Sequence, residues 1–228
     1  MHKVDILAQE WKLSAGALLE GEFLSGLTAG TLDPEYYRAY IRETYFNAAQ
    51  NVKNMSLFQA HLQTSNRSLE AKFLKHAAME IGHDEMALAD YGILGGDVAA
   101  ARRSRPLPTT EAMAAFIVFQ IQHRNPLAYL GYLYHLEALP IEIGEQALSG
   151  LARIGVPREA TTFLNEHAEA DPVHVKWNRE YIEGFVRSDE DFEALLYGMR
   201  GTCELHAAMF QGSIESVRRS RLPQAKAA

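Results

Sequence analysis

Cysteine is almost absent from this sequence, since Cys203 is the single one in 228 residues. One thiol cannot form an intramolecular disulfide framework, and it cannot supply a metal site built from several thiolates. The scarcity also fits a reducing compartment, so we expect a cytoplasmic protein.

The sequence also lacks the features that would indicate a membrane or a nucleic acid as partner. A membrane span would need a run of about 18 apolar residues, and none is present. The N-terminal residues contain no apolar stretch of the signal-peptide type. The formal net charge of -7 shows no excess of Lys and Arg with which to neutralise phosphates. We therefore expect neither partner.

Nothing in the sequence alternates with the period of two that β-strands show, whereas apolar residues recur at helical spacing. A chain with 47% hydrophobic residues can form one sizeable core. We expect an all-α, single-domain bundle of about seven helices over residues 1–222, and a disordered tail at 223–228. The expected helices are residues 4–19, 34–64, 68–91, 109–139 with a kink at Pro126, 141–154, 157–185 and 189–219.

The expected helix boundaries depend on capping residues, prolines and glycines. Asp33 before Pro34, and Ser188 before Asp189, are typical helix starts. Residues 26–31 are expected to break the first helix and residues 95–108 to form a plain linker, because both stretches are rich in turn-forming residues. Pro140 is expected to end a helix.

The most informative stretch runs from His167 to His174 and places His167, Asp171 and His174 at positions i, i+4 and i+7. On an α-helix, these positions lie within roughly 60° of one another on one face. Imidazole and carboxylate groups are the ligands of non-haem iron and manganese, and also of zinc. The spacing therefore predicts a metal site on this helix.

Two further patterns supply donors of the same kind. Glu80 and His83 form an E-x-x-H pair, and helical bundles use such pairs to hold di-iron or di-manganese centres. Glu137 is a single carboxylate within the apolar stretch 129–139. If it is buried, it needs a partner such as a metal ion or an arginine, because an unpaired buried charge costs several kcal/mol. A bridging glutamate would satisfy this need.

Each pattern also has an ordinary explanation. An E-x-x-H pair is most often a surface pair, and Glu137 alone would more often be a salt-bridged or exposed glutamate. His76, seven residues before His83, is a possible ligand or hydrogen-bond donor, although a core or surface histidine is the more common case. The agreement of three patterns on three separate helices favours the metal site.

Together these motifs give the chain a family resemblance. The order of Glu80-x-x-His83, then Glu137 in an apolar helix, then His167-x3-Asp171-x2-His174 resembles the haem-oxygenase-like di-iron oxidases and oxygenases. Thiaminase II and pyrroloquinoline quinone synthase share the helical bundle of that family. The resemblance covers most of the chain, from about Phe23 to the last helix.

The resemblance implies a site for two ferrous ions, or for iron and manganese, with O2 as the co-substrate. It implies Glu137 as the bridging, catalytic carboxylate. The implied reaction is the oxidation of a small organic acid or amino acid. Candidates to orient its carboxylate are Arg42, Arg124 and the neighbouring tyrosines, although a surface position is the more common one for an arginine. We also expect a homodimer. The implied ligands are Glu80, His83, Glu137, His167, Asp171 and His174.

Two other classes of protein stay open at this point. One is a metal-free hydrolase or cofactor-binding protein of the same fold, similar to thiaminase II; Cys203 in the last helix is far from where its thiol nucleophile would be expected. The other is a helical interaction protein in which the same residues form buried ion pairs. Iron content distinguishes the oxidase from both.

Overall fold

The computed structural model describes residues 2–222, except for the side chains of residues 169–172. The predicted tail at 223–228 lies outside the described residues. The described part is helical and contains no strand, which confirms the all-α prediction, but it has ten α-helices rather than about seven. In chain order they are α1 (Lys3–Leu19), α2 (Glu22–Ala29), α3 (Pro34–His61), α4 (Arg67–Met79), α5 (His83–Ile93), α6 (Val98–Arg103), α7 (Pro108–His123), α8 (Ala128–Arg153), the 3-10 helix η1 (Arg158–Ala160), α9 (Thr162–Phe185) and α10 (Asp189–Arg221).

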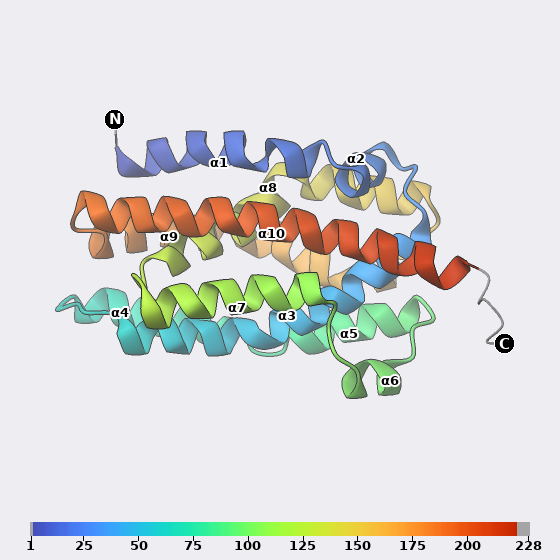
Figure 1. The fold of residues 1–228 in the computed structure, drawn as a ribbon, viewed down its shortest axis with the longest axis horizontal. Helices are drawn as coiled ribbons and strands as arrows, with labels where there is room; N and C mark the ends of the chain where they lie inside the picture. The colour runs from blue at the N-terminus through green and yellow to red at the C-terminus, as the bar shows by residue number, and fades with distance from the viewer. Residues whose placement is uncertain (1, 223–228) are drawn as a thin grey trace, which may run out of the picture.

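The long helices run roughly along one axis, and α10 crosses the middle of the molecule in Figure 1. α10 packs on α8, α7, α1 and α3, while α8 also packs on α9 and α2. α3 packs on α5 and α7, and α9 contacts both α4 and α5. α3, α4, α5, α8 and α9 therefore enclose the same interior region. No helix in the described part is both long and apolar enough to cross a membrane.

Capping residues start the long helices where the sequence predicts. The Asp33 side chain accepts a hydrogen bond from the Glu35 backbone N–H, and Pro34 occupies the first turn of α3. Ser188 and Asp191 form a reciprocal capping box at the start of α10. These local bonds satisfy backbone donors that the first helical turn leaves unpaired.

The helix predicted over residues 68–91 is broken in two at Gly82. This glycine has φ of 97°, in the left-handed region, and separates α4 from α5. Glu80 is the C-terminal cap of α4, and His83 is the first residue of α5. The E-x-x-H pair therefore spans a turn rather than lying on one helical face.

Proline acts differently from the prediction at two positions. Pro126 separates α7 from α8, where we expected a kink within one helix. Pro140 lies inside α8, which continues to Arg153 instead of ending. A proline within a helix costs about 3 kcal/mol. The buried residues on both sides of Pro140, among them Leu139 and Ala147, explain why the helix continues, because tertiary packing outweighs local propensity.

Short helices occupy two stretches that we expected to be irregular. α2 covers part of the predicted break and is capped at its C-terminal end by Gly30, whose φ is 68°. α6 lies within the predicted linker, where the Asp97 side chain accepts from the Ala100 backbone N–H. α9 begins at Thr162 rather than at Pro157 because η1 intervenes. Elements this short depend on caps, whereas hydrophobic periodicity needs several turns to become visible.

Two glycines allow α8 and α10 to approach each other closely. A Cβ atom at Gly131 would collide with the Leu195 carbonyl oxygen, and one at Gly198 would collide with that of Ala128. The close packing holds α8, which carries Glu137, at a fixed position in the interior.

Candidate metal centre

Six donor residues of the described chain gather in the interior between α4, α5, α8 and α9. His76 lies on α4, Glu80 caps it, and His83 starts α5. Glu137 lies on α8, and α9 carries the two remaining histidines, His167 and His174.

The donors form two groups that share one carboxylate. His76, Glu80 and His174 form the first group, and Glu80, His83 and His167 form the second. Within each group the ligand atoms all lie within 4.8 Å of one another. Glu80 belongs to both groups, so one of its oxygens can serve each.

The distances around Glu80 support this division. The Oε2 atom lies 3.2 Å from Nδ1 of His83. The Oε1 atom lies 3.8 Å from Nε2 of His76 and 3.9 Å from Nδ1 of His174. Two donors that each bond one ion at about 2 Å lie no more than about 4 Å from each other. The separations around Glu80 are therefore compatible with an ion held between its oxygens and the histidine nitrogens.

The sequence indicates His76 only as a possible ligand, and the structure places it within the cluster. Its side chain is fully buried, and neither ring nitrogen makes a hydrogen bond to any described residue. Its Nε2 atom lies 3.4 Å from Oε1 of Glu137. A buried imidazole without hydrogen bonds is unusual in a folded protein, and a metal ion would satisfy one of its nitrogens.

A repeated spacing in the sequence was the missed signal for His76. His76-x3-Glu80-x2-His83 has the same spacing as His167-x3-Asp171-x2-His174. In the structure the two copies pair in opposite directions. The rings of His76 and His174 are 4.3 Å apart between centroids, and those of His83 and His167 are 4.8 Å apart. The site therefore has approximate two-fold symmetry at the level of its histidines.

Asp171 corresponds to Glu80 in this arrangement, but its side chain lies outside the described residues. Its backbone belongs to α9, between the two histidines. Its predicted role as a ligand stays a prediction.

The protonation states in the cluster suit a metal. Burial lowers the pKa of His76, and the neighbouring His174 adds to the effect, so that it falls to about 4. Burial raises the pKa of Glu80, but the hydrogen bond to His83 and the charges of three histidines outweigh it and lower the pKa to about 2. Neutral imidazole and ionised carboxylate are the forms that bind metal ions.

Neighbouring groups orient two of the donors. Asn51 of α3 donates a hydrogen bond from Nδ2 to Oε2 of Glu80 at 2.9 Å, and Tyr129 in turn donates to Oδ1 of Asn51. His167 is 2.7 Å from the Phe163 carbonyl oxygen through Nδ1, which fixes a proton on Nδ1 and leaves Nε2 as the acceptor. Histidines that bind metals usually donate their other N–H in this way.

Glu137 lies at the edge of the cluster. Its side chain is buried, and Nδ2 of Asn178 is 3.5 Å from its Oε2 atom. Together with the contact to His76, this explains how a carboxylate is held within the apolar stretch of α8. Glu80, rather than Glu137, occupies the shared position in the described part of the site, and the predicted bridging role of Glu137 stays a prediction.

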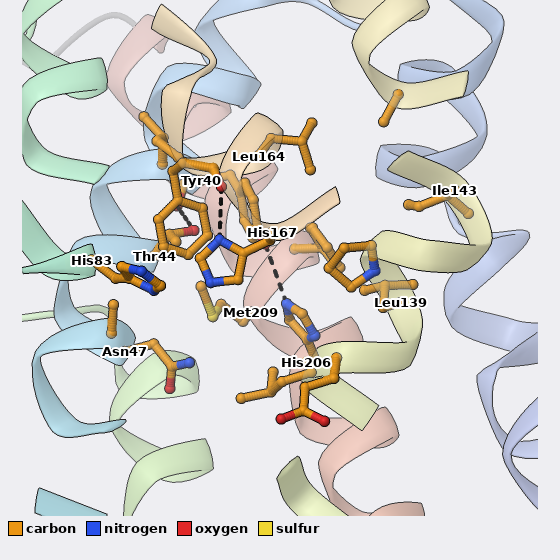
Figure 2. A pocket seen from close by; sticks show the side chains of 18 of the residues that line it. Tyr40, Thr44, Asn47, His83, Leu139, Ile143, Leu164, His167, His206 and Met209 are labelled. Carbon is orange, nitrogen blue, oxygen red and sulfur yellow. Dashed lines mark hydrogen bonds between the residues drawn. The ribbon is translucent and has the colours of Figure 1, made fainter. Parts of the chain in front are cut away.

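A pocket with a volume of about 120 Å³ adjoins the cluster. Glu80, His83, Glu137 and His167 form one part of its lining. The remaining wall is mostly aliphatic and includes Leu139, Ile143, Leu164 and Met209, as Figure 2 shows. Tyr40 and His206 are polar residues of that wall.

Neither of the two arginines that were candidates to orient a carboxylate lines this pocket. Arg42 pairs with Glu43 and donates to Ser104 Oγ and to the Arg105 carbonyl oxygen. Arg124 is exposed and lies over the ring of Phe119. Among the described lining residues there is no Lys or Arg. Arg42 and Arg124 are therefore not carboxylate-orienting residues of this pocket, whereas Tyr40, one of the neighbouring tyrosines, lines it.

Cys203 lies outside the pocket lining, on α10. Burial raises its pKa to about 12, so the thiolate form is scarce at neutral pH. A thiol in this state is a poor nucleophile. The geometry therefore gives no support to a thiol-dependent hydrolase.

Solved structures with the same fold cover nearly the whole chain. A domain of unknown function with a haem oxygenase-like fold from Shewanella denitrificans is 21% identical, with a TM-score of 0.88 over 100% of this chain and 98% of that one. A TenA homologue from Pseudomonas syringae is 13% identical, with a TM-score of 0.79 and 93% of each chain covered. A TenA homologue from P. horikoshii is 15% identical, with a TM-score of 0.77 over 94% of this chain and 99% of that one.

At these identities the structures show the fold alone, which is haem oxygenase-like. No curated protein matches the chain. Residues 38–207 match the family model described as iron-containing redox enzyme, and this match includes every donor residue of the cluster. The chain therefore belongs to the haem-oxygenase-like family of iron-containing redox enzymes.

Proposed function

We propose that the protein is a non-haem di-iron oxidase or oxygenase that uses O2 to oxidise a small organic acid or amino acid. The observation that carries this proposal is the pair of donor groups that share Glu80. A donor set of imidazoles and carboxylates, without thiolates, is the type that non-haem iron prefers.

The two donor groups suggest how the ions would be divided. His83 and His167 would hold one iron, His76 and His174 would hold the other, and Glu80 would contact both. The two-fold relation between the motifs gives Asp171 the place equivalent to Glu80. When bound, the ferrous ions would supply electrons for the reduction of O2.

The protein's own residues would confine and orient the substrate. The aliphatic wall beside the cluster excludes water, and Glu137 faces the same pocket from α8. No Lys or Arg lines this pocket among the described residues. The positive charge that would bind an acidic group of the substrate is therefore that of the metal ions rather than that of an arginine.

Anaerobic loading with ferrous iron tests the proposal. We expect about two irons per chain, as di-iron sites in helical bundles hold. Exposure to O2 should then give a transient visible absorption, and candidate acids should increase iron-dependent O2 consumption. Protein loaded with zinc is the control, since zinc has no redox chemistry. A protein that neither bound iron nor consumed O2 with any candidate acid would contradict the proposal.

A further inference from the structure

A buried chain of hydrogen bonds runs from α1 to the pocket and is separate from the donor cluster. Nε1 of Trp11 is 3.1 Å from Nδ1 of His135. Nε2 of His135 is 3.0 Å from Nδ1 of His206, and Nε2 of His206 is 3.4 Å from the Tyr40 hydroxyl. His135 is fully buried and His206 is 5% exposed, whereas Tyr40 and His206 both line the pocket.

The direction of this chain is fixed at its inner end. Indole N–H groups can only donate, so Nδ1 of His135 must accept from Trp11. The Cys203 thiol also lies near this nitrogen, with Sγ 3.2 Å away. A neutral imidazole that accepts at Nδ1 carries its proton on Nε2. His135 therefore donates to His206.

The same reasoning applies to His206 and Tyr40, the next two residues of the chain of hydrogen bonds. His206 accepts at Nδ1, carries its proton on Nε2 and donates to the Tyr40 oxygen. Burial lowers the pKa of His206 to about 4 and raises that of Tyr40 to about 12, so both are neutral at pH 7. The Thr44 side chain, which also lines the pocket, makes a second hydrogen bond to Tyr40 that lowers the pKa of Tyr40 against the larger effect of burial. A hydrogen bond that lowers the pKa of a phenol is one that its oxygen accepts, so the hydroxyl proton of Tyr40 is left to donate elsewhere.

We infer that Tyr40 is a specificity-determining residue that donates a hydrogen bond to an uncharged oxygen of the substrate, such as a carbonyl or hydroxyl oxygen. Trp11, His135 and His206 position this donor. The inference rests on the proposed function only in placing an acidic group of the substrate at the metal centre. The chemical class is therefore a short aliphatic acid with a second, neutral oxygen.

The size of the pocket limits the length of that acid. A cavity of about 150 Å³ holds a molecule the size of benzene. The volume of about 120 Å³ next to the cluster therefore suits acids of about five or six carbons, allowing for the carboxylate at the metal centre. Suitable test compounds are 4-oxopentanoate and 5-oxohexanoate, with pentanoate and hexanoate as the partners that lack the neutral oxygen.

Binding to the zinc-loaded protein, measured by calorimetry, tests the subsite without oxidation. We expect at least one oxo acid to bind about fivefold more tightly than its partner, the effect of one net hydrogen bond. Tyr40→Phe should abolish this difference and leave binding of the plain acids unchanged. Tyr134→Phe is the matched control, because Tyr134 is a buried tyrosine outside the pocket lining, and it should keep the difference.

Nitrogen NMR of the histidine side chains in the wild-type protein tests the chain of donors without any substitution. We expect unprotonated Nδ1 and protonated Nε2 at both His135 and His206. The opposite tautomer at His206, or equal affinities of wild type and Tyr40→Phe for both oxo acids, would overturn the inference. Failure of the oxidase proposal would appear separately, as absent iron-dependent O2 consumption in every variant.

Discussion

At the scale of single residues, His76 and Glu80 are the positions at which the proposed metal centre and a buried ion-pair network lead to different expectations. The Nε2 atom of His76 lies 3.8 Å from Glu80 and 3.4 Å from Glu137 and makes a hydrogen bond to neither carboxylate. A neutral imidazole at such distances adds no positive charge beside these buried carboxylates. An ion among them would supply that charge.

His76→Ala should therefore lower bound iron from about two to about one per chain, because only the group with His83 and His167 would stay complete. Iron analysis after anaerobic loading measures this, and circular dichroism checks that the bundle is folded. His61→Ala is the control, since His61 is exposed at the end of α3, and it should keep both irons. Two irons in His76→Ala would show that His76 is only a core residue.

Glu80 should matter more than any single histidine because it belongs to both groups. His83→Ala should remove about one iron, whereas Glu80→Ala should remove nearly all bound iron. The same loading experiment compares the two variants. Equal loss of one iron in both would argue against a shared carboxylate and would favour Glu137 in that role.

At the scale of elements, the turn between α4 and α5 brings Glu80 and His83 together. Gly82 adopts φ of 97°, and open space surrounds the position where a Cβ atom would be. Gly82→Ala should destabilise the protein by about 1–2 kcal/mol, because the strain is in the backbone and no neighbour can relieve it. Iron affinity should fall as well, since the turn positions both ligands.

Gly16→Ala is the matched control for this prediction. Gly16 lies within α1, and its Cβ position is equally open. There the same change should stabilise the protein by about 0.5–1 kcal/mol, because alanine is the better helix former. Urea denaturation of the metal-free variants measures both effects. The same sign in the two variants would contradict the backbone explanation.

Local signals explain which elements could be predicted from the sequence. Long helices with a cap, such as α3 and α10, were predicted close to their observed bounds, because a capping side chain acts within its own turn. The break at Gly82 and the continuation through Pro140 were not predicted. Whether a helix stops or continues at a glycine or proline within an apolar pattern depends on tertiary packing.

The same limit applies to the candidate site. Two patterns were visible as spacings within one segment: His167, Asp171 and His174 on α9, and the pair of Glu80 and His83. His76 was undervalued because its meaning depends on the antiparallel approach of α9, which no single segment encodes. Arg42 is an example of a residue that the sequence suggested and the structure places elsewhere. Its side chain binds Glu43 and Ser104 and does not line the pocket.

At the scale of the whole molecule, the bundle buries histidines outside the donor cluster as well, namely the hydrogen-bonded pair His135 and His206. Burial lowers the pKa of His206 to about 4, and burial together with His206 lowers that of His135 well below its usual value. In the unfolded chain these side chains would titrate near pH 6.5. The folded protein therefore resists protonation that the unfolded chain accepts.

This difference makes stability depend on pH in a definite direction. Above pH 6.5 neither state protonates His206, so its contribution is constant. Between pH 6.5 and about 4 the unfolded state binds one more proton, and the free energy of unfolding falls by about 1.4 kcal/mol per pH unit for this histidine. Below about pH 4 the folded state also binds the proton, and the loss levels off.

His206→Gln should therefore reduce the slope of stability against pH between pH 6 and 4.5 by about 1.4 kcal/mol per unit. Urea denaturation of the metal-free protein at several pH values measures the slope, and removal of the metal excludes competition between protons and iron. The variant has a lower stability at pH 7, because it loses the bond to His135, yet its stability should change less with acid. His123→Gln, at an exposed position, should keep the wild-type slope. An unchanged slope in His206→Gln would show that folding does not lower the pKa of this histidine, and would contradict the prediction.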